Sequence, residues 1–180
     1  MTHPSAGTRP AKADIITGFA SHVRAYQNAA DQLVHAAAEY LGLNLTDHRC
    51  LDIIERDGPI AAGDLARAAG LSAKAITTAI DRLQHAGYAQ RTADPRDRRR
   101  VLVAVTAEGH RRGEEIYAPL VRASRDMLQR YTPAELELLL DYLDRSHELL
   151  TTHVARLQEH VSAESDRHTT AEHPGQAARG

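Results

Sequence analysis

Two short segments with the composition of β-strands lie in the middle of a chain whose other segments have the spacing of helices. The two segments are Tyr88–Arg91 and Arg100–Val105, and valine occupies alternate positions of the second. Turn-forming and basic residues, Thr92–Arg99, separate them. The pattern predicts a two-stranded β-hairpin with a basic loop inside a mainly α-helical fold.

Two short helices are predicted directly before this hairpin. Asp64–Ala69 has helical spacing, and Gly70 follows it as a turn residue. Ser72 is a favourable N-cap for a second helix, which should run to about Ala86 and end at Gly87. A short helix, a tight turn, a second helix and a hairpin, in this order, form a winged helix-turn-helix.

A long helix is predicted before this central segment. Apolar residues recur at helical spacing over Asp14–Leu41, and Gly42 marks the expected end of that helix. Thr46 is expected to cap a second helix that ends near Asp57. Ile60 follows and is expected to form a one-residue strand bridge.

Two further helices are predicted after the hairpin. Thr106 should cap the first, which runs to about Arg130 and which Pro119 should bend or divide. The second begins with the capping box Thr132–Glu135. Its apolar seam alternates steps of four and three: Leu136, Leu140, Leu143, His147, Leu150, Val154, Leu157 and Val161. Such a heptad seam needs a partner, which is the first helix, its own copy in a second subunit, or both.

The charge of the chain is unevenly distributed. The 180-residue chain has a formal net charge of −2, whereas residues 61–105 contain 8 Lys or Arg and 4 Asp or Glu. A basic middle segment between acidic ends is typical of a module that binds phosphate groups.

The composition also excludes some classes of protein. Cys50 is the single cysteine, so no intrachain disulfide or cysteine-based zinc site can form. No apolar run approaches the roughly 18 residues of a membrane helix, and residues 1–13 lack the apolar core of a signal peptide. We therefore expect a cytoplasmic protein without membrane attachment, with disordered polar ends at 1–13 and 162–180.

The predicted helices and hairpin resemble the MarR family of bacterial winged helix-turn-helix transcription regulators. Three stretches carry the resemblance: GDLARAAGLSAKAITTAIDRLQHAGYAQR, DPRDRRRVLVAVTAEG and YTPAELELLLDYL. Its most specific part is the pattern Asp94-x-Arg96-Asp97-x-Arg99, followed by an apolar strand. The resemblance covers about residues 14–157.

This resemblance implies a homodimeric regulator, usually a repressor, that binds pseudo-palindromic double-stranded DNA and has neither enzymatic activity nor a cofactor. Its first and last helices would intertwine, with the seam from Leu136 to Leu157 in the dimer interface. In many members a small molecule, often a phenol or an aromatic acid, releases the DNA. The chain would then consist of an N-terminal dimerisation helix (14–45), a DNA-binding lobe (46–105) and C-terminal dimerisation helices (106–161).

The resemblance also implies which side chains face DNA. The helix from Ser72 to about Ala86 would be the recognition helix, which enters the major groove of DNA. Its DNA-facing residues would be Ser72, Lys74, Thr77, Thr78 and Arg82. In the loop of the hairpin, the wing, they are Arg96, Arg98, Arg99 and Arg100. We expect one or two of these arginines to enter the minor groove, and another to pair with Asp94 or Asp97 and so hold the shape of the wing. Without the surrounding fold, both sets would be read as solvated surface.

Candidate residues for an effector pocket follow from the topology. Polar groups on the first helix, on the second helix and on the helix after the wing could face it: His22, Tyr26, His48, Arg49 and Arg111. For each residue taken singly, an ordinary surface position is the simpler interpretation.

Several alternatives remain open. Cys50 is better explained as a small buried apolar residue than as a redox sensor. His48 and Asp52 are one helical turn apart, but no compact cluster of metal-ligating residues accompanies them, so no metal site is predicted. A redox- or metal-responsive regulator and a non-specific architectural DNA-binding protein remain as alternative functions. The winged-helix module of an enzyme is disfavoured, since no catalytic motif or glycine-rich cofactor loop is present.

Overall fold

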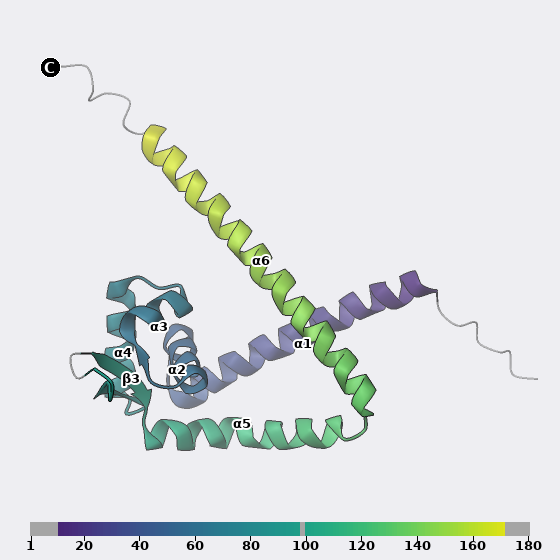
Figure 1. The fold of residues 1–180 in the computed structure, drawn as a ribbon, viewed down its shortest axis with the longest axis horizontal. Helices are drawn as coiled ribbons and strands as arrows, with labels where there is room; N and C mark the ends of the chain where they lie inside the picture. The colour runs from purple at the N-terminus through teal and green to yellow at the C-terminus, as the bar shows by residue number, and fades with distance from the viewer. Residues whose placement is uncertain (1–10, 98–99, 172–180) are drawn as a thin grey trace, which may run out of the picture. The chain divides into compact units, whose positions relative to one another are not determined.

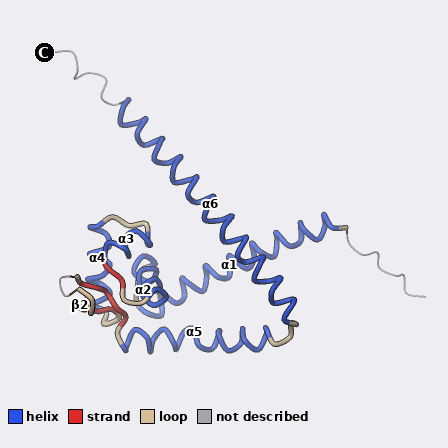
Figure 2. The backbone as a smooth tube through the Cα atoms, viewed as in Figure 1, coloured by secondary structure: helices blue, strands red, loops and turns tan. Residues whose placement is uncertain are grey.

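The computed structural model describes residues 11–97 and 100–171, the stretch 162–171 by its backbone alone. The elements, in order, are α1 (Lys12–Leu41), α2 (Leu45–Asp57), β1 (Ile60–Ala61), α3 (Ala62–Ala69), α4 (Ala73–His85), β2 (Ala89–Ala93), β3 (Val101–Val105), α5 (Ala107–Leu128) and α6 (Pro133–Ala171). Helices dominate and one small sheet accompanies them, as Figure 2 shows. The predicted fold class, a mainly helical winged helix-turn-helix, is confirmed. The chain divides into two units, residues 1–120 and 121–180, which are described separately below.

The sheet consists of three antiparallel strands in the order β1-β3-β2. The predicted hairpin is formed by β2 and β3, with Ala89 opposite Val105 and Ala93 opposite Val101. The predicted bridge at Ile60 is also present, because Ile60 pairs with Val103. The first strand thus adds a third strand to the hairpin, along the edge of β3 that faces away from β2.

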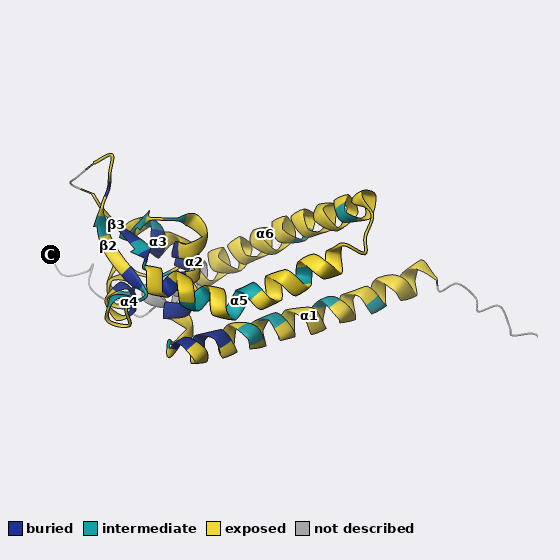
Figure 3. Ribbon diagram, turned by 90° about the horizontal axis from the view of Figure 1, so that it is seen from below, coloured by how far each residue is buried: buried dark blue, intermediate teal, exposed yellow. Residues whose placement is uncertain are grey.

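The hydrophobic core lies within the first unit, between helices α2, α3 and α4 and strand β3. Its largest fully buried apolar side chains are Ile54, Leu65, Ile76, Ile80, Leu83 and Val103. Figure 3 shows that buried residues concentrate in this lobe, whereas the long helices are mostly exposed. Burial of side chains of this size contributes about 1.5–3 kcal/mol each, so the lobe has the apolar contacts that hold its short helices in place.

The start of α2 differs from the prediction. Thr46 was expected to be the cap, but Asn44 caps the helix, and its Oδ1 accepts the backbone N–H of Asp47 at 2.9 Å. Asparagine is among the strongest N-cap residues, and its position here leaves Thr46 inside the first turn. The predicted cap of α4 is confirmed, since Ser72 Oγ accepts the backbone N–H of Ala75 at 3.2 Å.

The two long C-terminal helices begin where the sequence indicated. Thr106 Oγ1 accepts the N–H of Gly109 at 3.0 Å, and Thr132 and Glu135 form the reciprocal capping box. The backbone N–H of Thr132 and, after it, the Thr132 hydroxyl lower the pKa of the Glu135 carboxyl by hydrogen bonding to its charged form. Pro119 lies inside α5 without dividing it, so the chain forms one helix there rather than two.

The chain ends are more helical than predicted. Helix α1 begins at Lys12 rather than at residue 14, and α6 continues to Ala171, where a disordered tail from residue 162 was expected. Neither glycine nor proline interrupts the sequence after Pro133 until beyond Ala171, so each added residue extends the hydrogen-bond ladder. The rest of the predicted disordered ends, residues 1–10 and 172–180, lies outside the described residues. Among the described helices, no segment has the length and hydropathy needed to cross a membrane.

Candidate nucleic-acid interface

Helix α4 has one face that is buried in the core and an opposite face that is polar and exposed. Ile76, Ile80 and Leu83 are buried in the core, whereas Lys74 and Thr77 are exposed. The hydroxyl of Thr77 donates to the carbonyl of Ala73, and that of the exposed Thr78 donates to the carbonyl of Lys74. Because each hydroxyl proton is already donated, the oxygens of these two exposed residues remain as acceptors. With Lys74, the outer face offers a cation and acceptors of the kind that contact base edges.

An open hollow of about 530 Å³ lies where the start of α4 meets the start of α2. It is lined by Asn44, Thr46, Ser72, Lys74, Ala75, Thr78 and Arg82. Two helix N-termini meet there, and both favour negative charge nearby. Four of the five residues predicted for the recognition helix are thus brought to one depression.

Arg82 plays a different part from the other predicted recognition-helix residues. Its Nε and Nη2 each donate to one carboxylate oxygen of Asp47, both at 2.6 Å. Asp47 is only 2% exposed, and its Oδ2 also accepts from Asn44 Nδ2 at 2.7 Å. This pairing raises the pKa of Arg82. Arg82 therefore joins α4 to the start of α2, a role that the sequence did not predict for either residue.

The wing has an internally bonded turn. Asp94 is largely buried, and its Oδ1 accepts the backbone N–H of Arg96 at 2.8 Å. The N–H of Asp94 donates to the carbonyl of Arg100, and the N–H of Arg100 donates to the carbonyl of Asp97. The side chain of Arg96 is exposed at the outer end of this turn. Arg98 and Arg99 lie outside the described residues.

Two ion pairs join the hairpin and its loop to helices α3 and α4. Arg100 is one of the four wing arginines that were predicted to face DNA, with one of the four pairing with Asp94 or Asp97. In the structure, Arg100 Nη2 lies 3.0 Å from Asp64 Oδ2 of α3. Arg91 of β2 donates to Asp81 Oδ1 of α4 at 2.8 Å and to Gln84 Oε1. Arg91 was not singled out by the sequence, because its partners become neighbours only when β2 turns back along α4.

The predicted effector-pocket residues are not drawn together by the contacts that the structure describes. His48 is buried, and its Nε2 lies 3.2 Å from the Tyr117 hydroxyl of α5. Burial lowers the pKa of His48, and the nearby Asp52 opposes this effect in part. The other four residues have different surroundings. His22 forms a hydrogen bond with the carbonyl of Gly18, and Arg111 pairs with Glu108 and Glu115 of its own helix. Tyr26 and Arg49 are exposed.

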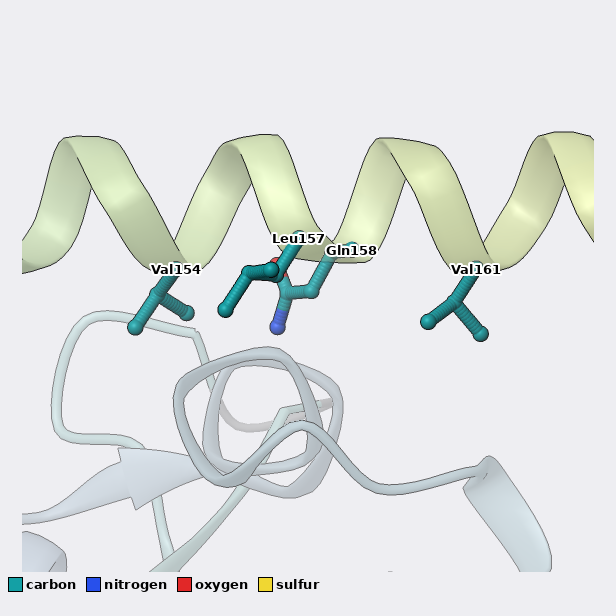
Figure 4. A pocket seen from close by; sticks show the side chains of 4 residues that line it. All are labelled: Val154, Leu157, Gln158 and Val161. Carbon is teal, nitrogen blue, oxygen red and sulfur yellow. The ribbon is translucent and has the colours of Figure 1, made fainter.

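The apolar seam of α6 is exposed over most of its length. Leu140, Leu143, Leu150, Val154 and Leu157 are each at least half exposed, and Val161 continues the row. Leu136 is half-buried, and His147 is exposed. Figure 4 shows Val154, Leu157, Gln158 and Val161 on one side of the helix, where they line an open hollow of about 340 Å³.

The residues considered for redox or metal sensing have simple surroundings. Cys50 is fully buried in the core, and burial raises the pKa of its thiol, which disfavours the reactive thiolate. Among the described residues, no three His, Cys, Asp or Glu side chains are grouped closely enough to hold a metal ion.

Comparisons with known proteins agree with this geometry. A family model described as "MarR family" matches residues 43–101. An uncharacterized HTH-type transcriptional regulator of Bacillus subtilis (strain 168), YcgE, is 36% identical over 124 residues, which cover 69% of this chain and 80% of that protein. An HTH-type transcriptional repressor of Mycobacterium tuberculosis is 29% identical over 99 residues, 55% of this chain and 71% of that protein. The solved structure of a MarR family protein from Bacillus stearothermophilus has a TM-score of 0.58 and 17% identity, and the alignment covers 79% of this chain and 99% of that one.

Proposed function

Because the chain belongs to the MarR family of helix-turn-helix transcriptional regulators, which are not enzymes, we propose that it binds a pseudo-palindromic operator as a homodimer. We further propose that it represses transcription in the cytoplasm and that a small molecule releases it from DNA. The similarity to a mycobacterial protein named as a transcriptional repressor supports the proposal that this chain represses transcription.

The observation that carries the DNA-binding proposal is the polar outer face of α4. An α-helix fits the major groove of B-DNA, where donors and acceptors distinguish the base pairs. Lys74, Thr77 and Thr78 are exposed on that face, and the core anchors the opposite face. Arg96 on the wing is suited to the adjacent minor groove, where the electrostatic potential is more negative.

The homodimer is proposed from the exposed seam of α6. A row of half-exposed leucines and valines is costly in water, and pairing with a second copy would remove it from solvent. Exposed apolar residues on α1, among them Ile15, Ile16 and Phe19, could take part in the same interface. A two-fold dimer would place two recognition helices one DNA turn apart, about 34–36 Å, and a pseudo-palindromic operator follows from that symmetry.

An effector site is proposed at the contact between α2 and α5. The imidazole of the buried His48 and the hydroxyl of Tyr117 meet there, and two such polar groups suit the hydroxyl or carboxylate of a phenol or an aromatic acid. A thermal-shift screen with phenolic acids tests this proposal. A redox-responsive mechanism makes a different prediction, since a Cys50→Ser variant would then lose its response to peroxide.

The DNA-binding proposal is tested by selection from a random double-stranded DNA pool with the full-length protein. We expect enrichment of one inverted repeat and a complex whose mass, measured by sedimentation, corresponds to two protein chains per duplex. Enrichment of no sequence would favour the alternative of non-specific architectural binding. One chain per duplex would contradict the homodimer.

A further inference from the structure

The last turn of α1 is held by a side chain of α5. Arg112 Nη2 donates to the carbonyl oxygen of Tyr40 at 3.3 Å, and Nη1 donates to the Tyr40 hydroxyl at 3.2 Å. The guanidinium carbon also lies 4.4 Å from the centroid of the Tyr40 ring. The Arg112 side chain is only 25% exposed, so these contacts are partly shielded from water.

Two neighbouring residues complete this cluster. Glu115 Oε2 accepts from Arg112 Nη1 at 3.0 Å and from the Tyr40 hydroxyl at 3.2 Å. Tyr88, just before β2, donates its hydroxyl to the carbonyl of Leu41 at 3.2 Å. Hydrogen bonding, first of all with Tyr88, raises the pKa of Arg112. Arg112 and Tyr88 thus bond the last two carbonyls of α1, whose own helix ends before it can supply donors, and a cation there also complements the helix dipole.

The cluster connects two long helices close to the points where each of them joins the lobe. Helix α1 joins the lobe through the short link Gly42–Asn44, and α5 leaves the lobe directly after Thr106. The first turn of α5 packs closely on the residue before β2, since a Cβ at Gly109 would lie 2.5 Å from the carbonyl oxygen of Tyr88. The N–H of Thr106 donates to the same carbonyl at 3.0 Å. Arg112 therefore fastens α1 to a part of α5 that is hydrogen-bonded to the start of the hairpin.

We propose that Arg112 is a positioning residue for operator binding: it fixes the direction of α1 relative to the recognition helix α4, and thereby the spacing of half-sites that the dimer accepts. The inference rests on the proposed function, in which a homodimer binds paired half-sites. A dimer whose DNA-binding lobes can turn about Gly42–Asn44 would bind half-sites at several spacings. A dimer in which Arg112 holds α1 in one direction would select a single half-site spacing.

The test measures affinity for inverted repeats whose spacer is varied by single base pairs, with half-sites taken from a selection with the wild-type protein. We expect wild type to bind one spacing more tightly than the others. In Arg112→Ala the ratio of affinities between the preferred spacing and the other spacings should fall on the order of tenfold, the factor expected when one charge-assisted contact is removed. Affinity for an isolated half-site should stay unchanged. Arg112→Lys, which keeps the charge but not the planar fork, should restore part of the preference.

Arg122→Ala is the matched control. It removes one positive charge from an exposed position of the same helix, about three turns from the cluster, and should leave the spacing preference intact. If Arg112→Ala does not fold, Tyr40→Phe removes only the hydroxyl contacts and should broaden the preference less. An unchanged spacing preference in the folded Arg112 or Tyr40 variant overturns the inference. A wild-type protein that selects no paired half-sites would instead overturn the proposed function.

Discussion

The carboxylate of Asp47 and the guanidinium of Arg82 form two hydrogen bonds of 2.6 Å each, which join the first turn of α2 to the recognition helix α4. The carboxylate is almost fully buried, whereas the arginine side chain is about half exposed. Bidentate pairs of this kind are geometrically specific as well as strong. The pair therefore holds α4 against the first turn of α2, while Lys74 and Thr78 remain exposed.

Removing the arginine of this pair should destabilise the lobe. In Arg82→Ala the buried carboxylate of Asp47 loses its cation and keeps the Asn44 amide as its side-chain partner, which destabilises the folded lobe. We expect a lower denaturation midpoint in urea and weaker DNA binding. The double variant Asp47→Ala/Arg82→Ala is the control, because it removes the unpaired charge. It should be more stable than Arg82→Ala, and equal or lower stability of the double variant would contradict this account of the pair.

The cap of α2 can be tested by comparing two neighbouring positions. Asn44→Ala removes the acceptor for the N–H of Asp47 and should lower the free energy of unfolding by about 1 kcal/mol. Thr46→Ala leaves the cap in place and should change stability by less than half of that. Chemical denaturation measures both, and a larger effect at Thr46 would restore the cap that the sequence predicted.

The exposed arginine of the wing should contribute to affinity through phosphate or minor-groove contact. Arg96→Ala is expected to weaken DNA binding and to reduce the slope of log affinity against log salt by about 1. Arg145→Ala serves as the control, since Arg145 pairs with Asp141 on α6, away from the wing in sequence and in the second unit. Equal salt slopes for wild type and Arg96→Ala would remove this residue from the interface.

The seam of α6 should be required for dimerisation. Leu150→Glu places a carboxylate in the proposed interface, where burial without a partner costs several kcal/mol. We expect sedimentation to show monomers at concentrations where wild type is dimeric. Leu149→Glu adds the same charge one residue away on a different face of the helix, and it should dissociate the dimer less. A Leu150→Glu protein that stays dimeric would place the interface elsewhere.

His48 should make stability depend on pH. Its pKa in the folded protein is lowered by burial, so the unfolded chain binds a proton at a higher pH than the folded chain does. Stability is therefore lost as pH falls below the unfolded value of about 6.5. His48→Gln should show a smaller decrease in melting temperature between pH 8 and pH 5.5 than wild type. A decrease of equal size in both proteins would show that His48 does not contribute.

Local signals explain which features could be predicted from the sequence. Ser72, Thr106 and the Thr132–Glu135 box each act within one helical turn, so their patterns determined where three helices begin. The alternation in β3 likewise predicted a strand within a hairpin. Local signals also led to the wrong cap for α2. Asn44 and Thr46 lie two positions apart, and either residue type can cap a helix.

Contacts between distant residues explain the rest. Asp47 and Arg82 are 35 positions apart, and Tyr40 and Arg112 are 72 apart. No periodicity links such pairs, because only the packing of α2 on α4, or of the end of α1 on α5, brings them together. For the same reason the sequence assigned both Arg82 and Arg100 to DNA contact, whereas the fold supplies Asp47 as a partner of Arg82 and Asp64 as a partner of Arg100.

Specific DNA recognition by the α4 face is the central claim, and the ratio of two dissociation constants tests it most directly. The affinity of the full-length protein for its selected inverted repeat is compared at physiological salt with its affinity for a shuffled duplex of equal length. We predict that the selected repeat binds at least about a thousandfold more tightly, and that Lys74→Ala reduces this ratio. A ratio near one would contradict operator recognition and leave only non-specific attraction to phosphate.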